Sequence, residues 1–159
     1  MIARRAYLFL ALLFSLGLTA QAQVCPPTSD MEPLPHPGWT KARPVEKYNA
    51  LAGFDMAGAV NPGELAVEFG PGDTALYLSY LAKTKGVQTW AIAPHIIKPI
   101  DPSINIIYGT VPQNLSLLNC LRGQVKLVLD FYAALAYSDD PLKSMLYGAM
   151  LLAPGGILV

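Results

Sequence analysis

The sequence predicts an α/β domain in which a parallel sheet lies between two layers of helices. Apolar runs of strand length alternate with helical stretches across short loops, and this alternation favours parallel strands joined by right-handed crossovers. A glycine turn, Gly70-Pro71-Gly72, separates the first of these runs from the helix that follows it. With 159 residues the chain has the length of one domain with a sizeable core.

Five runs have the composition of strands, because leucine, β-branched and aromatic residues dominate them. The first is followed directly by the glycine turn, and the second is ended by Pro94. The predicted strands are 65–69, 87–93, 104–108, 125–129 and 157–159.

Three helices are predicted in the first three quarters of the domain. One begins after Pro44, and its apolar face is expected to hold Val45, Tyr48 and the pair 51–52. A second runs from Ala75 to Lys83, because 73–74 can cap its start and Gly86 can stop it. The third has leucines at helical spacing at 115, 118 and 121.

The fourth predicted helix has the clearest start signal. Ser138-Asp139-Asp140-Pro141 combines short polar caps, acids at the positive pole and proline in the first turn. Apolar residues then recur at i, i+3, i+4, i+7 and i+8, which predicts one face buried in the core. These residues are Leu142, Met145, Leu146, Ala149 and Met150.

The N-terminus has the pattern of a secretory signal peptide. Arg4-Arg5 forms a positive region, 6–19 is apolar, and Ala20-Gln21-Ala22 is a small-x-small cleavage site. We expect residues 1–22 to be removed and the protein to be exported to the periplasm or secreted. The alternative is an uncleaved helix that anchors the protein in the membrane. Residues 23–44 are rich in proline and predict a linker or an arm, and residues 45–159 form the domain.

Composition excludes several classes of function. Removing Arg4 and Arg5 from the 11 basic residues leaves 9 against 11 acidic ones, a net charge of −2. There is no basic run and no basic–aromatic interleaving, so no nucleic-acid partner is expected. The sequence also lacks metal-binding spacings and a serine elbow. Export would permit a disulfide between Cys25 and Cys120, and two unpaired thiols remain the alternative.

Two phrases of the sequence resemble a known family. Glu68-Phe69-Gly70-Pro71-Gly72, with an acid two positions before the first glycine, resembles the first motif of class I S-adenosylmethionine-dependent methyltransferases. The phrase at 151–159, LLAPGGILV, resembles the one that leads into the fifth strand of that family. The resemblance covers roughly 63–159. It implies a three-layer, Rossmann-like sandwich with a sheet of order 3-2-1-4-5, lacking the family's usual strands 6 and 7.

The resemblance also implies a cofactor and a site. S-adenosylmethionine would bind at the carboxyl ends of the strands, and Asp130 would be the candidate residue facing the methyl acceptor. The implied cofactor-binding residues are Glu68, Phe69, Gly70, Pro71, Gly72, Thr110 and Asp130. No acceptor and no general base are identified by the residues. The apolar edge at 157–159 is expected to be open to pairing with another chain.

The sequence departs from the family at two positions that normally hold acids. Ala93 occupies the place of the acid that binds the ribose hydroxyls, and Thr110 that of the acid near adenine. His95 and Lys98 are candidates to compensate. A methyltransferase is therefore one hypothesis, and a catalytically inactive, exported binding or scaffold module is another. A dinucleotide-binding oxidoreductase fragment is a third, because the glycine turn is also found there.

Overall fold

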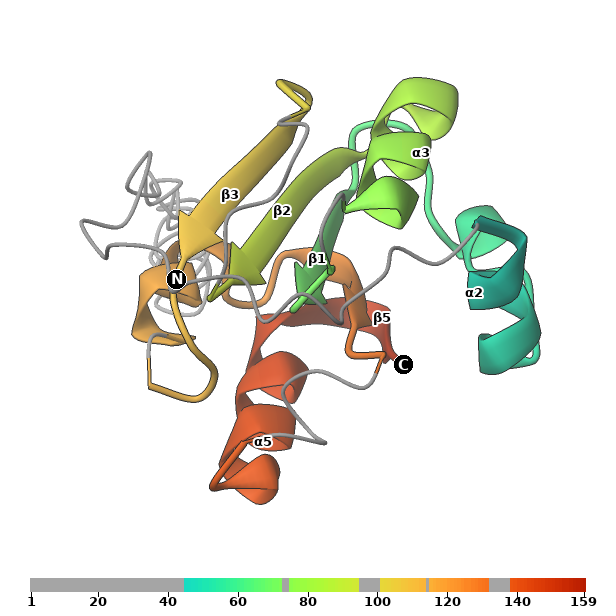
Figure 1. Ribbon diagram of the computed structural model, residues 1–159. Helices are drawn as coiled ribbons and strands as arrows, with labels where there is room; N and C mark the ends of the chain where they lie inside the picture. Colours follow the sequence, from blue (N-terminus) through green and yellow to red (C-terminus); the bar gives the residue numbers. More distant parts are fainter. Residues whose placement is uncertain (1–44, 73–74, 95–100, 114, 132–137) are drawn as a thin grey trace, which may run out of the picture.

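The computed structural model describes residues 45–72, 75–94, 101–113, 115–131 and 138–159. Helices and strands alternate along these residues, as the sequence predicts (Figure 1). The elements are α2 (Val45–Ala52), η1 (Ala57–Ala59), β1 (Leu65–Phe69), α3 (Leu76–Lys85), β2 (Gln88–Ala93), β3 (Ile104–Tyr108), η2 (Leu115–Leu121), β4 (Val125–Leu129), α5 (Pro141–Leu151) and β5 (Leu152–Leu158).

The five strands form one sheet of order β3-β2-β1-β4-β5, and all four pairings are parallel. The predicted fold class and strand order are therefore confirmed. β1 lies in the middle of the sheet, with β2 on one side and β4 on the other. The carboxyl ends of all five strands consequently lie along the same edge of the sheet.

Side chains alternate between two cores on the two faces of the sheet. One core lies under α2, η1 and α3 and contains Ala66, Tyr77 and Leu78. The other lies under η2 and α5 and contains Val67 and Phe69. The structure is thus a three-layer sandwich, with helices on both faces of the sheet (Figure 1).

β5 begins earlier than the sequence predicts. It starts at Leu152 and so includes Pro154-Gly155-Gly156, which the sequence pattern predicts as a turn before the strand. Between the pairs Val125–Leu152 and Leu127–Ile157, one residue of β4 faces four of β5. Gly156 is needed there, because a Cβ at this position would lie 2.8 Å from the carbonyl oxygen of Val125.

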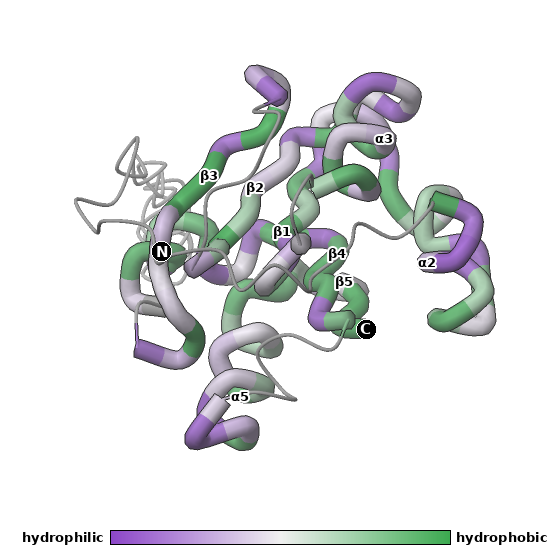
Figure 2. Tube along the Cα trace, viewed as in Figure 1, coloured by the Kyte–Doolittle hydropathy of each residue, from purple (hydrophilic) through white to green (hydrophobic). Residues whose placement is uncertain are grey.

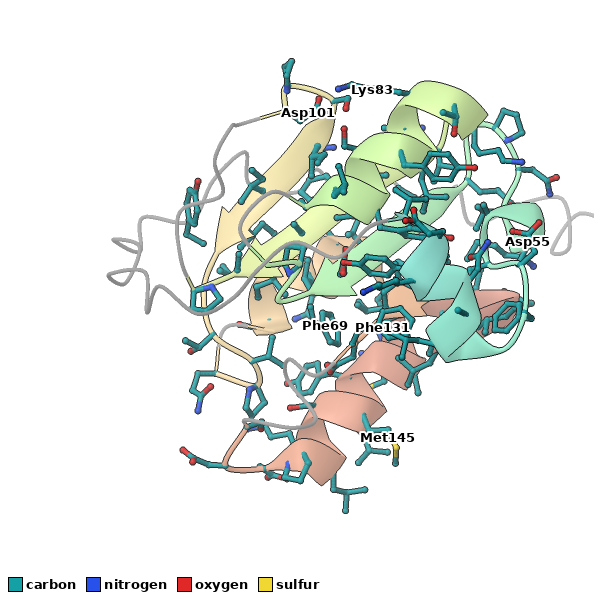
Figure 3. The ribbon with its side chains drawn as sticks, turned by 45° about the vertical axis from the view of Figure 1, so that its right-hand side comes forward. Asp55, Phe69, Lys83, Asp101, Phe131 and Met145 are labelled. Atoms are coloured by element: carbon teal, nitrogen blue, oxygen red, sulfur yellow. The ribbon has the colours of Figure 1, made fainter. Side chains whose placement is uncertain are left out.

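The predicted orientation of α5 is wrong. The face repeated at i, i+3, i+4, i+7 and i+8 is exposed, and Ser144, Gly148 and Leu151 are the buried residues. A Cβ at Gly148 would lie 3.2 Å from Leu158 and 3.5 Å from Phe69, so the helix approaches the sheet through its smallest residues. Met145 projects from α5 away from the sheet (Figure 3).

Smaller differences concern the ends and types of the helices. α3 begins at Leu76, and its N-cap is Ala75, which has a left-handed backbone (φ 47°) and no side-chain capping bond. The stretch 115–121 forms a 3-10 helix. Leu51, predicted on the inner face of α2, is 48% exposed.

The helix α2 is held on α3 by aromatic stacking and one amide. The rings of Tyr48 and Tyr77 stack with centroids 4.6 Å apart. The Tyr77 hydroxyl donates to Oδ1 of Asn49 at 3.0 Å, and the same oxygen accepts from the N–H of Met56 at 3.2 Å. The Asn49 amide in turn donates to Asp55 at 3.0 Å. The helix α2 is therefore fixed to α3 and to the turn that follows α2.

A carboxylate fixes the opposite end of α3. Asp101, just before β3, accepts hydrogen bonds from the hydroxyls of Ser79 and Ser103 and from the N–H of Ser103. Lys83 forms an ion pair with it at 2.6 Å (Figure 3). The hydrogen bond from Lys83 and those from the two serines hold the pKa of Asp101 well below its usual range. Hydrophilic residues gather at this end of the molecule (Figure 2).

Several sequence expectations concern residues outside the described ranges. The proposed signal peptide (1–22), the linker (23–44) and Cys25 all lie there. Cys120 is described and is disulfide-bonded. None of the helices that the structure describes has both the length and the hydropathy to cross a membrane.

We expect Tyr77→Phe to lower the free energy of unfolding by about 1 kcal/mol, the contribution of one hydrogen bond. Burial, and then the charge of Asp55, raise the pKa of Tyr77 well above its ordinary value of about 10. The native state therefore requires the protonated hydroxyl. The stabilisation that this hydroxyl contributes is present below about pH 10 and is lost at higher pH. Tyr80→Phe is the control. Urea unfolding between pH 7 and 11 should show a weaker alkaline decline in Tyr77→Phe alone, and equal declines in both variants would contradict this role.

We expect Asp101→Asn to destabilise the protein at neutral pH and to have little effect in acid. Because the folded-state pKa of Asp101 is lowered, its stabilisation is present above the unfolded value of about 4 and is lost as the pH falls further. Urea midpoints of the wild type and the variant should therefore differ at pH 7 and converge toward pH 2. The exposed Asp139→Asn is the matched control, and a difference that persists at pH 2 would speak against the proposed cause.

Candidate functional site

The candidate site lies at the carboxyl ends of β1 and β4. Glu68 is the fourth residue of β1 and only 2% exposed. Because Ala66 packs under α3 and Val67 and Phe69 pack under α5, alternation directs Glu68 to the α3 face. Its charge contributes to the raised pKa of Tyr77, although less than burial and Asp55 do. A carboxylate is thus held at the centre of the sheet, beside the first crossover helix.

The glycine turn leaves the end of β1 open on one side. Gly70 and Gly72 have positive φ angles of 60° and 74°, a conformation that favours glycine. The Gly70 N–H donates to the carbonyl of Ile92 at 2.8 Å, so the first residue of the turn is still hydrogen-bonded to β2. A Cβ at Gly72 would meet no described heavy atom within 4 Å, apart from its chain neighbours. A ligand can therefore approach the backbone there closely.

The structure brings the other predicted cofactor residues to the same edge. Phe69 and Pro71 are buried on either side of Gly70, and Asp130 follows β4 directly and is 8% exposed. Thr110 follows β3, which is separated from β1 by β2. Since neighbouring strands lie about 4.8 Å apart, Thr110 is roughly 10 Å from the end of β1 along the edge. The residues fit an elongated ligand better than a compact one.

The last residue of β2 is Ala93, so the end of this strand carries no acid. Ala93 is 3% exposed and pairs with Tyr108 on β3, and its carbonyl accepts from the N–H of Gly109 at 2.9 Å. The position therefore lies one residue past the Ile92–Gly70 bond, next to the glycine turn. Ala93 belongs to the core on the α3 face of the sheet.

An aromatic cluster next to the site was not predicted. Phe131, the residue after Asp130, packs edge-on against Tyr48 at 5.1 Å, and Tyr48 stacks on Tyr77. The cluster joins α2, α3 and the end of β4. The sequence offered one signal for it, the tyrosine on the buried face of the predicted leading helix, but nothing that connected this residue to position 131.

Some candidate residues lie outside the described ranges. These are Asp73, Thr74, His95 and Lys98. Among the described residues, no group of three or more histidine, cysteine, aspartate or glutamate side chains is placed to hold a metal ion. The polar groups at the described edge are the carboxylates of Glu68 and Asp130, the hydroxyl of Thr110 and backbone amides.

Comparison with known proteins gives a structural match. No family model matches the sequence, and no curated protein matches it at a significant level. A solved structure does match, with a TM-score of 0.52 and 21% sequence identity. It comes from the complex between the Haloferax volcanii Trm112 methyltransferase activator and a protein assigned as a methyltransferase. The match covers 72% of this chain and 50% of the other, so this chain spans half of the length of the protein that it matches.

At this level of identity the match is informative about the fold alone. The described part of this chain therefore has a Rossmann-like α/β fold similar to that of the matched structure, with a parallel sheet of order 3-2-1-4-5.

Proposed function

We propose that this chain binds S-adenosylmethionine at the carboxyl edge of the sheet and transfers its methyl group to an acceptor. The observation that carries the proposal is the unobstructed approach to the backbone of Gly72, just past the end of the central strand, which also holds the buried Glu68. The methyltransferase-like fold and the two sequence phrases support the same assignment.

Each residue has a position that suits one part of the cofactor. Glu68 and the backbone from 70 to 72 would hold the amino-acid half, because a carboxylate attracts its ammonium group and the glycines permit close approach. Thr110, two strands away, would lie at the adenine end. Asp130, directly after the neighbouring strand β4, would face the acceptor.

The chemistry asked of the protein is mainly positioning. The cofactor supplies a methyl group that its sulfonium already activates. The residues of this chain have to orient the acceptor in line with that methyl group and exclude water. The cluster of Tyr48, Tyr77 and Phe131 suits the second task, because it packs apolar surface beside Asp130.

The alternative function is a binding or scaffold module without catalysis. Ala93 favours it, since a hydrogen bond to a charged acceptor contributes about 1.5–3 kcal/mol and this residue provides none through its side chain. Weak binding, on the order of millimolar, would follow from such losses. Calorimetry with S-adenosylmethionine and S-adenosylhomocysteine separates the two, because absence of heat at millimolar ligand leaves only the module. Export is a proposal that rests on the sequence of residues 1–22.

We expect Gly72→Ala to weaken the binding of S-adenosylhomocysteine at least tenfold, which corresponds to about 1.4 kcal/mol. The new methyl group would occupy the space that the cofactor needs. Gly123→Ala is the matched control: its φ is 71°, and its Cβ would also meet nothing within 4 Å. Both variants should lose stability by a similar amount, about 1 kcal/mol, from the left-handed backbone.

The measurement is isothermal titration calorimetry on the wild type and both variants, together with their thermal unfolding. Equal affinities in the two variants would place the ligand somewhere other than the glycine turn. Glu68→Gln should weaken binding as well, because the ammonium group of the cofactor loses a charged partner.

We expect Ala93→Asp to strengthen the binding of S-adenosylmethionine about tenfold or more, because it adds a charged acceptor for the ribose hydroxyls. Ala93→Asn adds a similar volume without the charge and should gain less. Thermal unfolding with and without ligand checks that both variants fold. If the aspartate variant is folded and binds no better than the wild type, the end of β2 does not face the ribose.

A further inference from the structure

The helix α5 is apolar on two opposite sides. Ser144, Gly148 and Leu151 face the sheet. The residues on the other side, which we call the outer face of α5, are Leu142, Met145, Leu146, Ala149 and Met150, and the four large ones are 36–60% exposed. Contiguous exposed apolar side chains on a helix often mark an interaction site. The outer face therefore has the character of an interface.

The spacing of the outer face suits another helix. Its residues recur over two turns at the positions through which helices pack side by side. Ala149 lies within this stripe, and a small residue there lets a second helix come close. The large residues around it are leucine and methionine, which adapt easily to a partner's shape.

The two ends of α5 carry net charges of opposite sign. Asp139, Asp140 and Lys143 are exposed at its N-terminal end, which gives two acids against one base. At its C-terminal end the N–H of Gly123 donates to the carbonyl of Met150 at 3.1 Å, which places the exposed Arg122 there. If two copies of α5 packed antiparallel, each Arg122 would lie near the acids of the other copy. A twofold axis would form this contact twice.

We propose that the outer face of α5 binds a second copy of this chain, giving a symmetric dimer through an antiparallel pair of α5 helices. The self-complementary charges argue for a copy of the same chain rather than for an unrelated partner. Five apolar residues are few beside the roughly 20–30 on each side of a standard interface. We therefore expect a weak, reversible dimer with a dissociation constant in the roughly micromolar range. This inference does not depend on the proposed function.

Sedimentation velocity of the 159-residue chain, from about 1 to 200 micromolar, tests the dimer. The wild type should shift from monomer to dimer over this range, and Leu146→Glu should remain monomeric. Leu51→Glu is the matched control, because Leu51 is 48% exposed on α2 and Leu146 is 54% exposed. Circular dichroism checks that both variants are folded.

A charge exchange tests the antiparallel arrangement. Arg122→Glu alone and Asp139→Arg alone should each weaken the dimer, because each places like charges together at both ends. An equimolar mixture of the two variants should restore it, since both contacts of the mixed dimer then join opposite charges. A wild type that is monomeric at every concentration would overturn the proposal. So would association that Leu146→Glu leaves intact, as expected if the apolar N-terminal stretch or another surface were responsible.

Discussion

The central position of β1 is the constraint on which the rest of the structure depends. The strand is hydrogen-bonded on both sides and its last four residues are buried. The chain can therefore leave the sheet only after Phe69, at the carboxyl edge. The chain then turns into α3 within a few residues. This requires positive φ at Gly70, Gly72 and Ala75, and for an alanine it costs about 1–2 kcal/mol. Ala75 is fully buried, and its packing offsets that strain.

The two edges of the sheet are stabilised differently. At the amino edge, Asp101 joins α3 to the start of β3 through hydrogen bonds and the ion pair with Lys83. At the carboxyl edge the contacts are aromatic, and they join α2 to α3 and to the end of β4. The electrostatic attachment lies far from the candidate site. Glu68 and Asp130, at the carboxyl edge, therefore do not compete with Asp101 for Lys83.

The sequence was sufficient for much of the fold. The bounds of β1, β3 and β4 were predicted correctly, because a short apolar run between turn residues leaves little freedom in a buried parallel strand. The start of β5 was missed, because Pro154 and the two glycines looked like a turn, and their place in the strand depends on contact with Val125 of β4. The aromatic cluster was missed for a similar reason, since nothing local connects Tyr48 with Phe131.

The error in α5 is more informative. Periodicity identifies the residues that share a face of a helix, but it does not say which face meets the sheet. In α5 the close approach of the helix to the sheet determines which face is buried. Gly148 lets the helix backbone come near Phe69 and Leu158, and the hydroxyl of Ser144 is hydrogen-bonded to Ser138 and to the carbonyl of Asp140. The larger apolar residues then face outward, where only a further partner can bury them. The leucines and methionines of this exposed face have no role in packing against the sheet, so we attribute their apolar character to contact with another surface.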